Sequence, residues 1–274
     1  PPTPLAGRVS RAAAVNWTGR PGHPAPPAGC SVRAMSEGLP ASGLELRSTV
    51  SDDATVTVTI EEGPVTPPGD DQVVVRVEAA PINPSDLRML FAGGDVSAAE
   101  RAASGTPTVR VPVKPAALAG LVPRLGRALP AGNEGAGTVI AAGSSPRAQE
   151  LVGRVVGFFS GNAYAQYRAL SVDQCIAMPD GVTPEQAASP FVNPLTALGM
   201  VETMRGEGHT ALVHTVGASN LGLMLNRICR ADGVPLVNLV RRPEQVELLR
   251  AEGAEYVVDT RAADFPDRLV DALA

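Results

Sequence analysis

A glycine-containing turn over residues 217–222 follows a short apolar run at 211–216 and precedes a helical pattern that starts near Asn220. Glycines remove side chains where a backbone must approach a pyrophosphate, and a helix start offers free N–H groups and a positive dipole end. We therefore expect a dinucleotide phosphate to bind along this turn. The residues expected to bind it are Gly217, Ala218, Ser219, Asn220, Leu221 and Gly222. The spacing differs from G-x-G-x-x-G, and the alternative is that the glycines serve only tight packing.

The next apolar run, at 235–240, indicates which dinucleotide is bound. An acidic residue at the end of this strand normally binds the ribose 2′-hydroxyl. This chain has Asn238 in the run and Arg241 and Arg242 directly after it. Because a guanidinium fork suits a 2′-phosphate, we predict NADPH rather than NADH, bound by these three residues. The alternative is a pair of solvated arginines that precede a helix.

The elements that must position these residues form an α/β unit. The strand, turn, helix and second strand have the length of a βαβ unit, and a third strand is expected at 256–259. We predict a Rossmann-type doubly wound parallel sheet over residues 186–274. Such a domain has six strands in two halves. Only the first half is visible, so we expect a fragment truncated at Ala274 and inactive by itself.

The preceding residues are rich in short strands. Strands are expected at 55–61, 73–77, 132–142, 153–159, 163–170 and 175–178. Many short strands separated by turns are typical of a barrel-like β domain, which we place at residues 35–185. The first two of these strands are expected to form an antiparallel pair. Residues 92–131 are predicted to be a long connection, either solvated or offering basic residues to a phosphorylated substrate.

A rigid turn precedes the long connection. Two prolines bracket Asn83, and Ser85 or Asp86 is expected to cap a short helix toward Phe91. The turn either presents the Asn83 amide as part of a binding wall or uses it to close the turn. Further along, Thr183 and Pro184 are predicted to begin another helix, with Thr183 as its cap.

Composition excludes several classes of function. The formal charge of −5 gives no basic footprint for nucleic acid, and no apolar run approaches a membrane span. Cys30, Cys175 and Cys229 are too far apart for a zinc cluster and are expected to be inert thiols in a reducing compartment, which favours the cytoplasm.

Residues 1–34 are predicted to be a disordered extension, because they lack the apolar content for a core. They are either translated sequence before Met35 or a transit peptide, which would make the location organellar.

The order of these elements resembles the medium-chain dehydrogenase/reductase superfamily. Its zinc-free quinone oxidoreductases and its trans-2-enoyl-thioester reductases are the most similar branch. The resemblance covers about residues 55–260, and its motifs are A-P-I-N-P-S-D at 80–86, G-N-E-G at 132–135, V-N-P-L-T-A at 192–197 and A-S-N-L-G at 218–222. It implies a GroES-like domain followed by a Rossmann domain, with the active site between them, and a homodimer when the chain is complete.

The resemblance also implies roles for single residues. Asn83 and Thr196 are expected near the nicotinamide or the substrate carbonyl, where they would act catalytically, and Asn193 is expected to contact the cofactor. Zinc-dependent members carry cysteine and histidine where this chain has Asn83 and Asn133, so we predict no metal. The catalytic tyrosine that enoyl reductases carry after the Asn-Pro-Ser-Asp helix is missing.

Together these features predict an NADPH-dependent oxidoreductase that transfers hydride, without zinc, to a quinone or an activated C=C bond of a small molecule. One alternative is an NADPH-binding protein without catalysis. Another is a relative of the zinc-type alcohol dehydrogenases. A third is a β scaffold whose glycine turn is purely structural.

Overall fold

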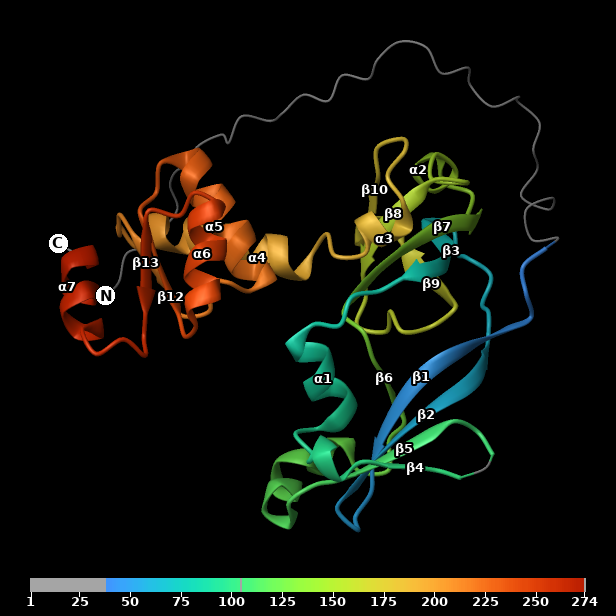
Figure 1. Ribbon diagram of the computed structural model, residues 1–274. Helices are drawn as coiled ribbons and strands as arrows, with labels where there is room; N and C mark the ends of the chain where they lie inside the picture. Colours follow the sequence, from blue (N-terminus) through green and yellow to red (C-terminus); the bar gives the residue numbers. More distant parts are fainter. Residues whose placement is uncertain (1–37, 104, 274) are drawn as a thin grey trace, which may run out of the picture.

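A computed structural model of the chain describes residues 38–103 and 105–273 (Figure 1). The predicted extension over residues 1–34, together with Cys30 and Met35, lies outside the described residues. Two antiparallel sheets come first and a parallel sheet flanked by helices comes last. None of the described helices is long and apolar enough to cross a membrane.

The first antiparallel sheet has the strand order β4-β5-β2-β1-β6. Its strands are β1 (Ser42–Val50), β2 (Thr55–Pro64), β4 (Glu100–Arg101), β5 (Thr108–Pro112) and β6 (Leu129–Pro130). Strand β2 confirms the prediction for residues 55–61, whereas β1 was not predicted. The two form a hairpin in register from Ser42↔Pro64 to Val50↔Val56.

The second antiparallel sheet has the order β10-β8-β7-β3-β9. Its strands are β3 (Gln72–Ala79), β7 (Glu134–Ala142), β8 (Val155–Phe159), β9 (Tyr167–Ser171) and β10 (Cys175–Ala177). All five lie within predicted strands or overlap them. The predicted pairing of β2 with β3 is wrong, because β2 pairs with β1 and β5 while β3 pairs with β7 and β9. Alternation of apolar residues marks a buried face of a strand but does not identify its partner.

The predicted long connection over residues 92–131 is largely structured. It contains β4, β5, β6 and the 3₁₀ segments η2 (Val96–Ala98) and η3 (Pro115–Arg124). Arg124 donates from Nη2 to the Met89 carbonyl oxygen at 2.7 Å, at the end of helix α1 (Pro84–Phe91). Burial lowers the pKa of this guanidinium. Arg124 therefore anchors the connection to α1, which does not fit the prediction of a solvated loop.

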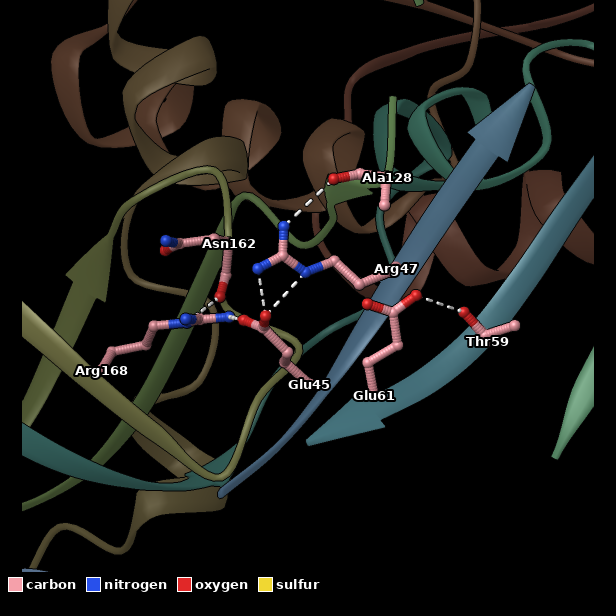
Figure 2. A network of polar contacts seen from close by, with 7 residues as sticks. All are labelled: Glu45, Arg47, Thr59, Glu61, Ala128, Asn162 and Arg168. Carbon is pink, nitrogen blue, oxygen red and sulfur yellow. Dashed lines mark hydrogen bonds and ion pairs between the residues drawn. The ribbon is translucent and has the colours of Figure 1, made fainter. Parts of the chain in front are cut away.

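Charged side chains tie the two antiparallel sheets together (Figure 2). Glu45 on β1 accepts hydrogen bonds from Arg47 on the same strand and from Arg168 on β9, the latter at 2.8 Å. Arg168 also donates to the Asn162 carbonyl oxygen, and Arg47 donates to that of Ala128 at 3.1 Å. Burial by itself would raise the pKa of Glu45, but the hydrogen bonds and charges of the two arginines lower it overall.

Valine and alanine fill the cores of the two antiparallel sheets. One core cluster surrounds Val73, Val139 and Phe158 in the second sheet, and another surrounds Val50, Val56 and Val111 in the first. Short helices α2 (Pro146–Gln149) and α3 (Pro184–Ala187) and the 3₁₀ segment η4 (Val172–Gln174) complete this part. Thr183 caps α3 as predicted, with its Oγ1 accepting from the Gln186 amide.

The parallel sheet has the order β11-β12-β13. Its strands β11 (Leu212–His214), β12 (Leu236–Val240) and β13 (Tyr256–Asp259) confirm the three predicted strands. The helices are α4 (Val192–Gly206), α5 (Asn220–Asp232), α6 (Pro243–Ala251) and α7 (Phe265–Leu273). Helices α4 and α5 pack together through Ala197, Val201, Leu225 and Cys229.

Helix α4 lies between the two antiparallel sheets and the parallel sheet (Figure 1). The boundary predicted between residues 185 and 186 falls within α3, which packs against β3, β7 and β8. The chain leaves these strands through residues 188–191 and enters α4. This short passage joins the two halves of the molecule.

Candidate active site

A cavity of about 640 Å³ lies between the barrel strands and the start of α4. This volume falls in the range of small-molecule sites. Ser85 and Asn133 form part of its barrel side, and Val192, Leu195 and Thr196 contribute the first turns of α4. The remaining lining residues are Phe159, Asp173, Gln174 and Phe191. The Phe159 and Phe191 rings lie 6.1 Å apart between centroids, so the cavity has an aromatic wall with polar groups around it.

The rigid turn before α1 is closed by its own backbone and by Asp86. Asn83, not Ser85 or Asp86, is the N-cap residue, and its N–H donates to Asp86 Oδ2 at 2.8 Å. The sequence therefore identified the right turn but the wrong capping residue. Asp86 is fully buried and holds the turn, as expected for a residue that fixes local structure.

Asn133 is oriented by the same carboxylate. Its backbone N–H and its Nδ2 donate to Asp86 Oδ1 at 2.9 and 2.7 Å, and Nδ2 also lies 3.0 Å from Ser85 Oγ. Because Asp86 and Ser85 both bond the side-chain nitrogen of Asn133, the orientation of its amide group is defined. Asn133 and Ser85 therefore form a pre-organised polar edge of the cavity.

Asn83 lies behind this edge. It is 4% exposed, is absent from the cavity lining, and donates from Nδ2 to Glu134 Oε1 at 3.0 Å. In this arrangement the Asn83 amide supports the wall from behind, and the catalytic role predicted for Asn83 stays a prediction. Glu134 is the other buried acid of the site, and it also accepts from Ser189 and from the start of α4.

Tyr164 supports the turn from the other side. Its hydroxyl donates to the Pro81 carbonyl oxygen at 2.8 Å, and its ring packs where a side chain on Gly132 would lie. Burial and the nearby carboxylates of Asp86 and Glu134 raise the pKa of this phenol, so it stays protonated at physiological pH. No role was predicted for Tyr164, because it lies 83 positions from Pro81 along the chain.

Thr196 lines the cavity on the α4 side. Its Oγ1 donates to the Val192 carbonyl oxygen at 2.5 Å, one helical turn earlier. The hydroxyl proton is therefore used inside α4, and the oxygen is left as an acceptor toward the cavity. Asn193 lies in the first turn of the same helix and is half-buried.

The predicted glycine turn joins the end of β11 to the start of α5. Ser219 caps α5, with Oγ accepting from the Gly222 amide at 3.0 Å. A Cβ on Gly222 would lie 2.1 Å from the Gly217 carbonyl oxygen, and one on Gly217 would lie 2.8 Å from Asn238 Cβ. Both glycines are thus required by close contacts within the protein. These contacts support the alternative that the glycines serve tight packing. They leave the start of α5 available to bind an anion.

The residues after β12 reach the same edge of the parallel sheet. His214 pairs with Asn238, so the strand ends that carry the turn and the two arginines are adjacent. Arg242 forms an ion pair with Glu244 at 3.2 Å, whereas the exposed Arg241 side chain has no such partner among the described residues. Asn238 is fully buried beneath Gly217, with Nδ2 3.5 Å from Asn226 Oδ1. Its side chain is buried in this structure, and its predicted contact with the cofactor stays a prediction.

The site does not fit a metal ion. Asn83 and Asn133, at the positions of the zinc ligands in zinc-dependent relatives, both use their amide nitrogens as donors to carboxylates. Amides are also poor zinc ligands compared with thiolate or imidazole. Among residues 38–103 and 105–273, no group of three His, Cys, Asp or Glu side chains converges on a point.

Comparison with known proteins identifies the relatives of this chain. It is 35% identical over 157 residues to a quinone oxidoreductase of Pseudomonas aeruginosa. This alignment covers 56% of this chain and 47% of the relative. It is 32% identical over 210 residues to a mitochondrial enoyl-[acyl-carrier-protein] reductase of Caenorhabditis elegans, covering 74% of this chain and 52% of the relative. The chain thus spans about half the length of the curated relatives it matches. No family model matches it.

Solved structures agree in fold. A crystal structure from Mesorhizobium loti, of a protein assigned as an NADPH:quinone reductase, matches with a TM-score of 0.61 and 30% identity, covering 85% of this chain and 64% of that one. The Escherichia coli quinone oxidoreductase complexed with NADPH matches with a TM-score of 0.59 and 19% identity, covering 85% and 63%. The second likeness concerns the fold alone.

The fold is that of an oxidoreductase with a GroES-like half-barrel and a Rossmann-type parallel sheet, as predicted. The chain is homologous to the quinone oxidoreductases and enoyl reductases of the medium-chain dehydrogenase/reductase superfamily. Its residues at positions 83 and 133 fit the zinc-free branch of that superfamily.

Proposed function

We propose that this protein is an NADPH-dependent oxidoreductase that reduces a quinone or an activated C=C bond without zinc. The observation that carries the proposal is the cavity between the barrel and α4, which has an aromatic wall and a fixed polar edge. The relatives, which are quinone oxidoreductases and enoyl reductases, support the same chemistry. The substrate is a small molecule, because a cavity of about 640 Å³ has the size of small-molecule sites.

Two features of the chain fit NADPH. The start of α5 and the turn that contains Ala218 and Ser219 form an anion site at the edge of the parallel sheet. Arg241 follows the adjacent strand with its guanidinium exposed and without an ion pair to any described residue, and it can bind a 2′-phosphate. When bound, the nicotinamide supplies a hydride, which carries both electrons of the reduction.

The residues of the chain bind and orient. Ser85 lines the cavity, and its hydroxyl can donate, without ionising, to a substrate oxygen that gains negative charge. Asn133 donates both Nδ2 protons, to Asp86 and Ser85, so it orients Ser85 and offers its amide oxygen as an acceptor. Thr196 offers an acceptor from α4 on the opposite side. Phe159 and Phe191 exclude water from one wall and give a planar acceptor an apolar surface. Reduction of a quinone is completed by one proton from solvent.

The test is steady-state oxidation of NADPH by the purified full-length protein with a panel of quinones, enones and enoyl thioesters. We expect turnover with at least one acceptor, and Asn133→Ala should reduce kcat/KM about 10- to 100-fold because one oriented polar group is lost. Tight NADPH binding without oxidation of any acceptor would instead show a non-catalytic binding protein. A homodimer and a cytoplasmic location, which suits the free thiols of Cys175 and Cys229, are further parts of this proposal.

A further inference from the structure

The Glu134 carboxylate lies at the passage between the two halves of the molecule. Glu134 opens strand β7, is fully buried, and does not line the cavity. Oε1 accepts from Asn83 Nδ2 at 3.0 Å and from Ser189 Oγ at 3.2 Å. Oε2 accepts from the backbone amides of Phe191 at 2.8 Å and Val192 at 3.0 Å. Four donors from two segments, the turn at Asn83 and the passage into α4, therefore converge on one carboxylate.

Two of these donors are the first amides of helix α4. The N-cap residue of this helix is Phe191, which has no side-chain oxygen to accept from them, and no side chain of the helix does so. By contrast, α3 and α5 are capped by their own Thr183 and Ser219. Free amides at a helix start need an acceptor, and a negative charge there is favourable. Glu134 thus supplies from the barrel the cap that α4 lacks in its own sequence.

The same residue fixes both walls of the cavity. On the barrel side it directly follows Asn133, whose side chain forms part of the polar edge. On the other side it holds Val192, from which the cavity-lining Leu195 and Thr196 are one turn away. Helix α4 packs on α5 in the parallel-sheet half, so its position relative to the barrel depends on this junction. An error of about 1 Å between reacting groups can cost about 100-fold in rate.

We propose that Glu134 is a positioning residue that caps helix α4 from the barrel and thereby sets the spacing of the two cavity walls for hydride transfer. It acts through Asn133 and Val192 and does not touch the substrate. The kinetic part of this inference rests on the proposed function, whereas the capping contact can be tested without any turnover.

The capping contact is tested by hydrogen exchange. In Glu134→Gln, the side-chain amide keeps the shape but presents an NH₂ group either to Asn83 or to the α4 amides, all of which are donors. We expect the Phe191 and Val192 amides to exchange about tenfold faster or more, because the hydrogen bonds that protect them weaken. Ser189→Ala is the matched control, since it removes a donor from the same carboxylate and leaves both amide bonds. Unchanged exchange at residues 191 and 192 in Glu134→Gln would refute the contact.

The positioning role is tested by separating binding from turnover. In Glu134→Gln we expect the affinity for NADPH to stay within about twofold of wild type, because the turn and Arg241 are remote from the junction, while kcat falls about 10- to 100-fold. Ser189→Ala should retain most of the turnover. Equal loss of NADPH affinity and turnover, or unchanged kcat, would overturn the positioning role. Failure of the wild-type full-length protein to oxidise NADPH would instead refute the proposed function, and the exchange experiment would still decide the contact.

Discussion

At the scale of single residues, the structure separates side chains that face a ligand from those that hold them in place. Asn83 and Asp86 were singled out with the motif A-P-I-N-P-S-D, and both are buried supports. Ser85, which lies between them in the sequence, forms the polar edge of the cavity together with the distant Asn133. A motif identifies the segment that builds a site, but the rotation of the backbone decides which of its side chains faces the cavity.

Arg241 and Arg242 provide a prediction at this scale. Arg241→Ala should weaken NADPH binding about tenfold or more and leave NADH binding unchanged, because a guanidinium–phosphate contact is charge-assisted and only NADPH carries the 2′-phosphate. Arg242→Ala is the control, since that side chain is paired with Glu244. Titration of nucleotide fluorescence measures both affinities. Equal weakening of NADPH and NADH by Arg241→Ala would contradict the assignment.

At the scale of elements, contacts between strands and helices carry the architecture. The glycine turn joins β11, α5 and β12 because Gly217 and Gly222 have no side chains in the way. The helix α4 begins where Glu134 of β7 accepts its first amides. Strands β1 and β9, from different sheets, are joined by Glu45 and Arg168. Each junction joins segments that lie apart in the chain.

The Glu45 junction makes a pH-dependent prediction. At neutral pH, Glu45→Gln should lower the free energy of unfolding by about 1–2 kcal/mol, because two partly buried guanidinium groups lose their charged partner. The pKa of Glu45 is lowered in the folded state below its ordinary value of 4.5, so its contribution is complete above that value and is lost as the pH falls further. The difference between wild type and variant should therefore shrink below that pH.

Urea unfolding at a series of pH values measures this difference. Glu61→Gln is the matched control, because Glu61 lies directly across from Glu45 in the β1–β2 pair but is exposed and bonded to Thr59. We expect it to change stability by less than about 0.5 kcal/mol at any pH. A difference for Glu45→Gln that persists unchanged below the folded-state pKa would contradict the ion-pair explanation.

At the scale of the whole molecule, the two halves have separate cores. The clusters around Val73 and Val50 belong to the antiparallel sheets, and those around Leu225, Val237 and Leu249 belong to the parallel sheet. Regions with their own cores can unfold as separate cooperative units. The cavity lies at their junction, so its shape depends on how the halves are held together.

Calorimetry tests this separation. We expect two unfolding transitions, of which NADPH shifts the one that belongs to the parallel-sheet half. At a concentration of about 100 times Kd, the ligand should stabilise that half by about 2.7 kcal/mol. NADH at the same concentration is the control and should shift it less. A single transition that moves as a unit with NADPH would show that the halves unfold together.

Local patterns in the sequence determined much of this protein. Alternating apolar residues and short apolar runs predicted β2, β3, β7, β8, β10 and the three parallel strands. Side chains on the buried face or faces of a strand are apolar, so their pattern along the chain is visible in the sequence. The glycine turn and the motif G-N-E-G indicated the right family, since few residue types fit such positions.

Other features were decided only by tertiary structure. The sequence missed β1, the pairing of β2, and the order within residues 92–131, because strand partners and anchors such as Arg124 are set by distant contacts. It also contained no sign that the side chains of Asn83 and Asn238 are buried. Residue type shows what a side chain is able to bond, whereas the packing of distant segments decides what it meets. Glu134 lies 57 positions before the Phe191 amide that it binds, and local sequence contains no sign of that contact.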